Sequence, residues 1–194
     1  MKIVINTLLV ALIVFLAYLL YANIKDPIAF QDVKNMRSQV VVEKLQEIRK
    51  AQEIYRDITG VFANSFDTLT YVLTNDSIPF ENIIGDPDDP SNMEFVVRTI
   101  TYSAAIDTIR ALGINLDSLR YVPFAEAGTE FTIEADTMSY QQSMVSVVEV
   151  GTRWREFMGQ YASKRYAKYD SRYDPDNRIK FGDMTKPNLT GNWE

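Results

Sequence analysis

The pattern of hydrophobic positions changes character near Lys25. Residues 3–22 form an apolar run in which Asn6 and Thr7 are the only hydrogen-bonding side chains before Tyr18. About twenty helical residues cover the hydrocarbon core of a bilayer, which is about 30 Å thick. The run therefore predicts a transmembrane anchor over residues 1–24, with Tyr18 and Tyr21 among the headgroups at its far end.

Two other segments share this pattern, a cleaved secretory signal and a buried core helix. A signal peptide that ended at Ala22 would need a small residue two positions earlier, but that position is occupied by Leu20. Core helices of this length ordinarily carry a charge. In an anchor, Asn6 is costly in lipid, so we expect it to face a partner helix or the interface. Thr7 can bond its own backbone. Both are predicted interaction residues.

Beyond the anchor, a second apolar pattern has the period of a helix. Asp26 and Pro27 predict a break or bend, and a long amphipathic helix follows over about residues 30–59. Its apolar stripe is Val41, Leu45, Ile48, Ala51, Tyr55 and Ile58. Gly60 is the predicted stop.

The stripe has two interpretations. The first is packing against the chain's own domain. The second is contact with a partner, for which Val41, Leu45 and Ile48 are the predicted interaction residues. Gln52 lies in the seam and argues against a coiled coil.

The remaining sequence predicts an α+β domain over residues 25–194. We expect a short helix through about residue 73, capped by Asn64 or Ser65, and a loop over 75–92. Alternating or β-branched runs predict strands at 95–102, 119–124, 130–137 and 144–150, which make an antiparallel sheet over about 95–150. A short helix is expected at 104–112, a helix or irregular segment at 153–169, and a polar, turn-rich tail at 170–194. Phe131, Ile133 and Ala135 share one face of their strand, which predicts a sheet whose opposite face is exposed to solvent.

Composition narrows the chemistry. The formal charge is −6 and no basic cluster interleaves with aromatics, which argues against nucleic-acid binding. The chain has no cysteine and no histidine, so nucleophile–histidine triads and ordinary zinc sites are excluded. We therefore predict no enzyme and no cofactor. A carboxylate-dependent hydrolase and a solute- or lipid-binding domain stay as alternatives.

Two acidic clusters have the oxygen ligands that calcium prefers. The first is Asp86, Asp88 and Asp89; the second is Asp170, Asp174 and Asp176, followed by Asn177. Both are weak calcium candidates, because Asp-Pro and Asp-Asn pairs are also ordinary turn formers. An aromatic series near the C-terminus fits either a buried face or a docking surface, and the helical spacing favours burial. It consists of Trp154, Phe157, Tyr161, Tyr166, Tyr169 and Tyr173.

The first 75 residues carry a resemblance. Ala51-Gln52 and Tyr55, then Gly60-Val61-Phe62-Ala63, then Leu69 follow a long helix. This order resembles type IV pilins and the pseudopilins of type II secretion. The chain departs from the family in lacking the Gly-Phe processing junction and in having Ile5 where many mature members carry a glutamate that registers subunits in a filament.

The resemblance implies a non-catalytic structural subunit of a bacterial envelope assembly. It implies a single-pass protein of the inner membrane with its C-terminal domain in the periplasm and with protein partners, in homo- or hetero-oligomers. An alternative is an accessory subunit that docks through its anchor onto a larger secretion, motility or insertion complex.

The charges beside the predicted anchor disagree on its orientation in the membrane. Lys2 favours a cytoplasmic N-terminus, whereas Lys25, Lys34 and Arg37 at the other end of the anchor oppose it. A very short tail before a large domain favours the domain outside the cytoplasm.

Overall fold

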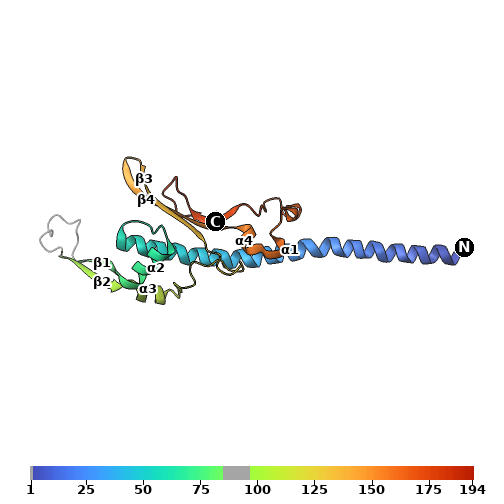
Figure 1. Cartoon of the computed structure of the whole chain (residues 1–194), viewed down its shortest axis with the longest axis horizontal. Coiled ribbons are helices and arrows are strands. Elements are labelled where there is room, and N and C mark those ends of the chain that lie inside the picture. The colour runs from blue at the N-terminus through green and yellow to red at the C-terminus, as the bar shows by residue number, and fades with distance from the viewer. Residues whose placement is uncertain (1, 85–96) are drawn as a thin grey trace.

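One helix extends through more than a quarter of the chain. The computed structural model describes residues 2–84 and 97–194, and in it α1 (Lys2–Thr59) is a continuous helix of 58 residues. Figure 1 shows α1 as a rod whose first half stands alone and whose second half lies within the rest of the molecule. We call residues 2–24 the bare segment and the packed remainder, from residue 25 onward, the head.

Of the break or bend predicted at Asp26-Pro27, the break is wrong, because α1 passes through Pro27. A proline inside a helix removes one backbone hydrogen bond and crowds the carbonyl four residues earlier, at a cost of about 3 kcal/mol. That carbonyl belongs to Asn23, whose side chain is exposed. Water can hydrate it there, so the long helices on either side outweigh the local cost.

The head is α+β. Its other elements are, in chain order, α2 (Phe66–Asn75), β1 (Ser77–Ile84), β2 (Val97–Ala104), α3 (Ala105–Ala111), β3 (Thr132–Tyr140), β4 (Ser143–Arg153), α4 (Trp154–Met158), η2 (Gly159–Tyr161), η3 (Lys164–Lys168) and β5 (Arg178–Gly182). Two predicted helix signals are confirmed. Gly60 ends α1 with φ at +81°, and the Ser65 side chain caps α2 by accepting a hydrogen bond from the Thr68 amide.

The strands form two antiparallel sheets rather than the single predicted sheet over 95–150. β1 pairs with β2, with Phe80 opposite Thr101, and the second sheet has the order β3-β4-β5. The pattern missed β1 because Pro79 stands inside it and because Asn75, Asp76 and Ser77, which precede this proline, are typical of a loop. In a two-stranded ribbon each strand has an open edge, where a proline can be accommodated. Both hairpins project from the end of the head that lies farthest from the N-terminus (Figure 1).

Two further expectations about the second sheet need correction. Residues 119–124 form turns and contribute a single bridge between Tyr121 and Glu130 instead of a strand. The tail predicted to be turn-rich contains β5, which pairs with β4. The predicted alternation in β3 is confirmed: Phe131, Ile133 and Ala135 are buried or half-buried, whereas their neighbours are exposed.

The core lies between the second half of α1 and the elements wrapped around it. α1 contacts α2, β1, α4 and β5. Fully buried side chains come from each part of the head, among them Leu45, Leu73, Ile109, Phe157 and Phe181. Because α1 supplies one wall of this core, the bare segment and the core of the head share one helix.

Candidate functional site

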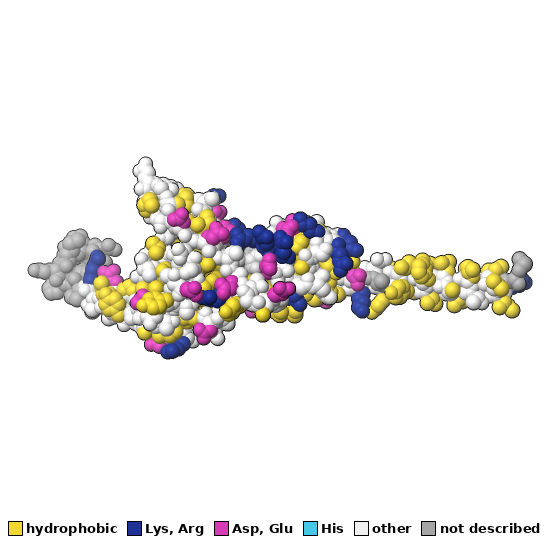
Figure 2. Space-filling view, in the orientation of Figure 1, with side chains coloured by type: hydrophobic (Ala, Val, Ile, Leu, Met, Phe, Trp, Pro, Cys, Tyr) yellow, Lys and Arg dark blue, Asp and Glu magenta, His cyan; other side chains and the backbone are white. Residues whose placement is uncertain are grey.

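The bare segment is an unpartnered apolar surface. Every side chain described between residues 2 and 26 is exposed, and the most apolar window has a mean hydropathy of 2.8 with none of its residues buried. Figure 2 shows apolar side chains covering it on the side in view. Burying one large aliphatic side chain stabilises by about 1.5–3 kcal/mol, so exposure in water is strongly unfavourable. The segment is long and apolar enough to span a membrane.

Two polar residues, Asn6 and Thr7, lie within the apolar run before Tyr18, and their side chains differ in their hydrogen bonds. The Thr7 hydroxyl donates to the Ile3 carbonyl at 3.0 Å, which satisfies it within the helix. The Asn6 side chain makes no hydrogen bond to any residue that the structure describes, and it is exposed. In an apolar medium, Asn6 is therefore the group that calls for an external partner.

The head first encloses α1 at Phe30. This ring is fully buried, with centroids 5.1 Å from Tyr173, 5.5 Å from Tyr166, 5.7 Å from Tyr161 and 6.1 Å from Tyr169. We call these four tyrosines the clamp. The Tyr173 hydroxyl donates to the Tyr161 carbonyl at 2.8 Å, and burial raises the pKa of Tyr173 to about 12. The aromatic series near the C-terminus thus forms a buried face, as its spacing favoured.

Polar contacts tie the same face of α1 to the segment that carries the clamp. Gln31 donates to the Tyr169 carbonyl at 3.3 Å, Lys34 forms an ion pair with Asp170, and Arg37 donates to the Phe157 carbonyl at 2.5 Å. Both partners of the ion pair are largely buried, with side chains 20% and 16% exposed. The hydrogen bond from Lys34 is the main reason that the pKa of Asp170 lies below its ordinary value.

Replacing Lys34 with methionine is expected to lower the free energy of unfolding by about 1–2 kcal/mol at neutral pH, because it removes a charge-assisted hydrogen bond. The pKa of Asp170 is lowered from 3.8 in the folded chain. The contribution of the pair is therefore complete above that value and is lost as the pH falls through the lower folded pKa. Denaturant titration of the detergent-solubilised chain by tryptophan fluorescence measures both effects.

Lys50→Met is the matched control, because Lys50 is an exposed lysine of the same helix. It should change stability by no more than about 0.5 kcal/mol. A K34M deficit that stays constant down to pH 2 would show that the Asp170 charge is not its cause.

The predicted interaction residues on the second half of α1 lie in the interior of the head. Val41, Leu45 and Ile48 are each 0% exposed and belong to the core of the head. They are therefore not available to a partner while the head is folded. In this structure the stripe packs on the chain's own domain, which is the first of the two interpretations.

The second acidic cluster is drawn into pairs with different cations. Asp170 pairs with Lys34, and Asp176 pairs with both Arg155 and Lys164. Asp174 accepts a hydrogen bond from the Asp176 amide at 2.9 Å. Within the described parts of the chain, no three acidic side chains lie close enough to hold an ion together. The cluster at residues 86–89 lies outside the described residues, so calcium binding stays a prediction.

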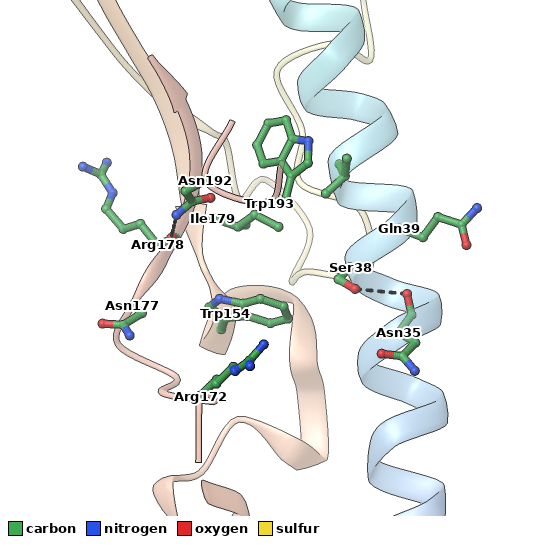
Figure 3. A pocket seen from close by; sticks show the side chains of 11 residues that line it. Asn35, Ser38, Gln39, Trp154, Arg172, Asn177, Arg178, Ile179, Asn192 and Trp193 are labelled. Atoms are coloured by element: carbon green, nitrogen blue, oxygen red, sulfur yellow. Dashed lines mark hydrogen bonds between the residues drawn. The ribbon is translucent and has the colours of Figure 1, made fainter. Parts of the chain in front are cut away.

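A groove of about 520 Å³ lies beside α1, between Asn35–Gln39 and the C-terminal residues Asn192 and Trp193. Figure 3 shows the Trp154 and Trp193 indoles at this groove, whereas the Arg178 side chain points away from it. The volume is within the range of small-molecule sites. Its lining contains amides, a serine, two indoles and Arg172.

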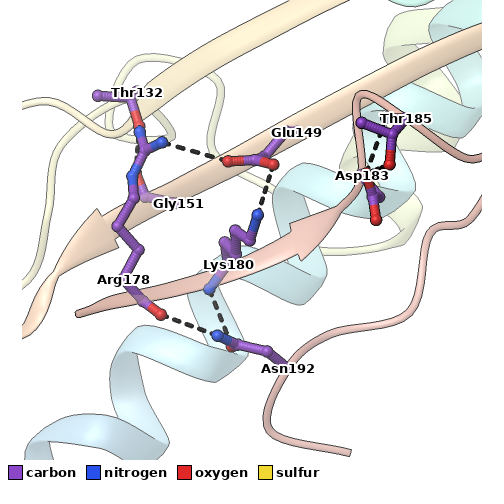
Figure 4. A network of polar contacts seen from close by, with 8 residues as sticks. All are labelled: Thr132, Glu149, Gly151, Arg178, Lys180, Asp183, Thr185 and Asn192. Carbon is purple, nitrogen blue, oxygen red and sulfur yellow. Dashed lines mark hydrogen bonds and ion pairs between the residues drawn. The ribbon is translucent and has the colours of Figure 1, made fainter.

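Glu149 is the centre of a polar network between β4 and β5 (Figure 4). Its carboxylate accepts from Arg178 at 3.2 Å and from Lys180 at 2.5 Å. Asn192 accepts from the Lys180 amide at 3.1 Å and donates to the Arg178 carbonyl at 2.8 Å. Both carboxylate oxygens of Glu149 thus accept from cations of β5, and the two Asn192 bonds hold the C-terminal segment against this strand.

Sequence reasoning missed the importance of two residues on α1. The sequence pattern did not indicate burial of Phe30, because Asp26 and Lys34, four positions away on either side, give its face of the helix a charged pattern. Gln52 is 0% exposed and joins the Ala63 amide and carbonyl, at 2.9 Å and 3.0 Å. Its position in an otherwise apolar stripe was the available signal.

Comparison of the chain with protein-family models, with curated proteins and with solved structures finds no match.

Proposed function

We propose that this chain is a non-catalytic structural subunit of a bacterial envelope assembly, similar in build to pseudopilins, held in the inner membrane by its bare segment. One observation carries the proposal: a single helix is bare and apolar over its first part and forms a wall of the head over its second. The head therefore cannot separate from the bare segment without losing the helix that forms one wall of its core. This arrangement suits a permanent support rather than an enzyme that binds and leaves a membrane.

The division of α1 into a bare and a packed part supports association through the bare segment. The stripe through Val41, Leu45 and Ile48 is buried in the head, so the surface that remains for partner helices is the bare segment. Helices associate in lipid through packing and through polar side chains that bond across the interface. Asn6 is the residue of the bare segment that fits this role.

A second candidate, an accessory subunit docked on a larger membrane complex, is favoured by Ile5. This side chain is apolar and 53% exposed, whereas the resemblance would place a carboxylate there to register subunits in a filament. A helix without that carboxylate, but with Asn6 beside it, suits a contact with a different membrane helix. The two candidates share the anchor and differ in the partner.

Purification of the whole chain in mild detergent from membranes of its native cells is expected to recover partner proteins in fixed stoichiometry. Regular fibres in the purified material would support the pseudopilin-like subunit, and a discrete complex would support the accessory subunit. Asn6→Leu should lower partner recovery about three- to tenfold, because one interhelical hydrogen bond in lipid is worth about 0.6–1.4 kcal/mol.

Thr7→Val is the matched control for Asn6→Leu, because the Thr7 hydroxyl is already satisfied by Ile3. It should leave recovery within about twofold of the wild type. A chain that elutes alone and monomeric would contradict both assembly proposals.

The orientation of the chain in the membrane can be measured in the same cells. The chain has no cysteine, so Ser139→Cys at the exposed β3–β4 hairpin gives a single thiol for a membrane-impermeant maleimide. Labelling only after lysis would place the head in the cytoplasm.

A further inference from the structure

The head carries basic side chains at the end where the bare segment leaves it. Figure 2 shows dark blue side chains gathered at this junction, although the whole chain has a net charge of −6. The segment of residues 164–172, which we call the collar, lies among the clamp tyrosines that surround Phe30. Its basic residues Lys164, Arg165, Lys168 and Arg172 are all exposed.

Most of these cations are not neutralised within the head. Lys164 pairs with Asp176, but Arg165, Lys168 and Arg172 form no ion pair with any residue in the described ranges. The Arg165 guanidinium instead lies over the Tyr166 ring at 4.7 Å, and the Lys168 ammonium over the Tyr169 ring at 4.6 Å. Their side chains thus rest on aromatic rings while their charges stay open to a ligand.

The same combination recurs on α1 below the collar. Lys25 lies over the Tyr21 ring at 5.8 Å and has no ion pair within the described ranges. Asp26 and Asp32 are exposed on this part of α1, and Asp174 lies close enough to act on Lys164 and Tyr173, so these carboxylates offset some of the positive charge. Four open cations still exceed these three carboxylates, so the described side chains at the junction carry a net positive charge.

The length of α1 places the collar at the height of lipid headgroups. Phe30 lies eight residues beyond Ala22, which is about 12 Å at 1.5 Å per residue. The headgroup layer extends about 5–8 Å beyond the hydrocarbon core on each side. The Lys and Arg side chains of the collar, with a reach of about 6 Å, span the remaining distance.

We propose that the collar, together with Lys25, binds the phosphates of anionic phospholipid headgroups, so that the head makes a second contact with the membrane beside its anchor. The proposal rests on the membrane span proposed above and holds for either orientation of the chain. Tyrosine rings suit the interface, and each Lys or Arg near an anionic surface contributes about 1 kcal/mol. The contact fixes the angle between head and bilayer.

Whole chain reconstituted in vesicles tests this with a fluorophore on Ser171→Cys in the collar or on Ser139→Cys at the β3–β4 hairpin. Both serines are exposed. The vesicles are phosphatidylcholine alone or with phosphatidylglycerol, each with a trace of lipid carrying a spin-label quencher on its headgroup. We expect quenching at Ser171 to increase with phosphatidylglycerol and to fall with added salt, and quenching at Ser139 to stay low throughout.

Arg165→Gln with Lys168→Gln is expected to reduce the phosphatidylglycerol-dependent part of the quenching at least fivefold, because two cations are lost. The matched control is Lys50→Gln with Lys186→Gln, which removes two exposed lysines elsewhere on the head and leaves this quenching unchanged. Equal losses in both double variants would overturn the collar, since they would show only an effect of total charge.

Flotation separates this proposal from the membrane span. A chain that floats with pure phosphatidylcholine vesicles, but shows the same quenching at Ser171 in both lipids, retains its anchor and overturns the collar alone. A chain that fails to float with phosphatidylcholine overturns both proposals. A chain that floats and is quenched at Ser171 only in the presence of phosphatidylglycerol supports both.

Discussion

Replacing Phe30 with alanine is expected to release the clamp from α1 and to lower the free energy of unfolding by about 3–5 kcal/mol. The ring is 0% exposed and lies within 6.1 Å, centroid to centroid, of all four clamp tyrosines. Alanine would leave a cavity that four rings on separate turns cannot close together. The loss should be greatest in residues 161–173, which hold the clamp and the collar.

Hydrogen exchange and denaturant titration of the detergent-solubilised chain measure these effects. Amides of residues 161–173 should lose protection, whereas those of β4 should keep most of theirs, because local opening is less costly than global unfolding. Phe80→Ala serves as the control, since Phe80 is 47% exposed on β1. It should shift stability by no more than about 1 kcal/mol. Unchanged protection of the clamp in F30A would mean that other contacts hold this part of the head.

The second large effect is expected at Gln52, where leucine should lower the free energy of unfolding by about 2–5 kcal/mol. The Gln52 side chain is fully buried and satisfies both the amide and the carbonyl of Ala63, which is itself 1% exposed. Leucine has nearly the same volume but leaves two buried backbone groups without partners, at about 1–3 kcal/mol each. A hydrophobic substitution in an apolar stripe thus destabilises.

Two variants separate the lost hydrogen bonds from a change of packing. Gln39→Leu, at an exposed position of the same helix, should change stability by no more than about 0.5 kcal/mol. Gln52→Glu can accept from the Ala63 amide but, when ionised, cannot donate to its carbonyl, so it should also destabilise at neutral pH. Denaturant midpoints that are equal for Q52L and the wild type would show that the Ala63 groups find other partners.

Local patterns predicted those parts of the fold that depend on neighbouring residues. The stripe of α1, the Gly60 stop, the Ser65 cap and the alternation in β3 follow from periodicity and from side-chain chemistry within a few positions. Pro27 was misjudged because its cost is local whereas the helices that offset it are long. β1 and β5 were missed because each is held by a partner strand, which no pattern in its own few residues specifies.

The candidate site was predictable to a smaller extent. The apolar run from Ile3 and the polar exception at Asn6 are visible in the sequence. The burial of Val41, Leu45 and Ile48 was one of two alternatives, and the sequence could not choose because an apolar stripe fits a domain core and a partner equally well. The collar could not be found, since its position depends on Tyr166 meeting Phe30, 136 residues earlier in the chain.

The passage of α1 through Pro27 joins the bare segment and the wall of the head in one continuous helix. Thr59 lies about 55 Å beyond Ala22 along the helix axis, at 1.5 Å per residue. Membrane helices tilt by about 20° on average, and such a tilt moves a point at that height sideways by about 19 Å. If the bare segment spans a membrane as proposed, a small tilt of it would move the two hairpins at the far end of the head by a much larger distance (Figure 1). Binding of lipid headgroups to the collar would limit this movement, so the lipid composition of the membrane would set how far the hairpins can move.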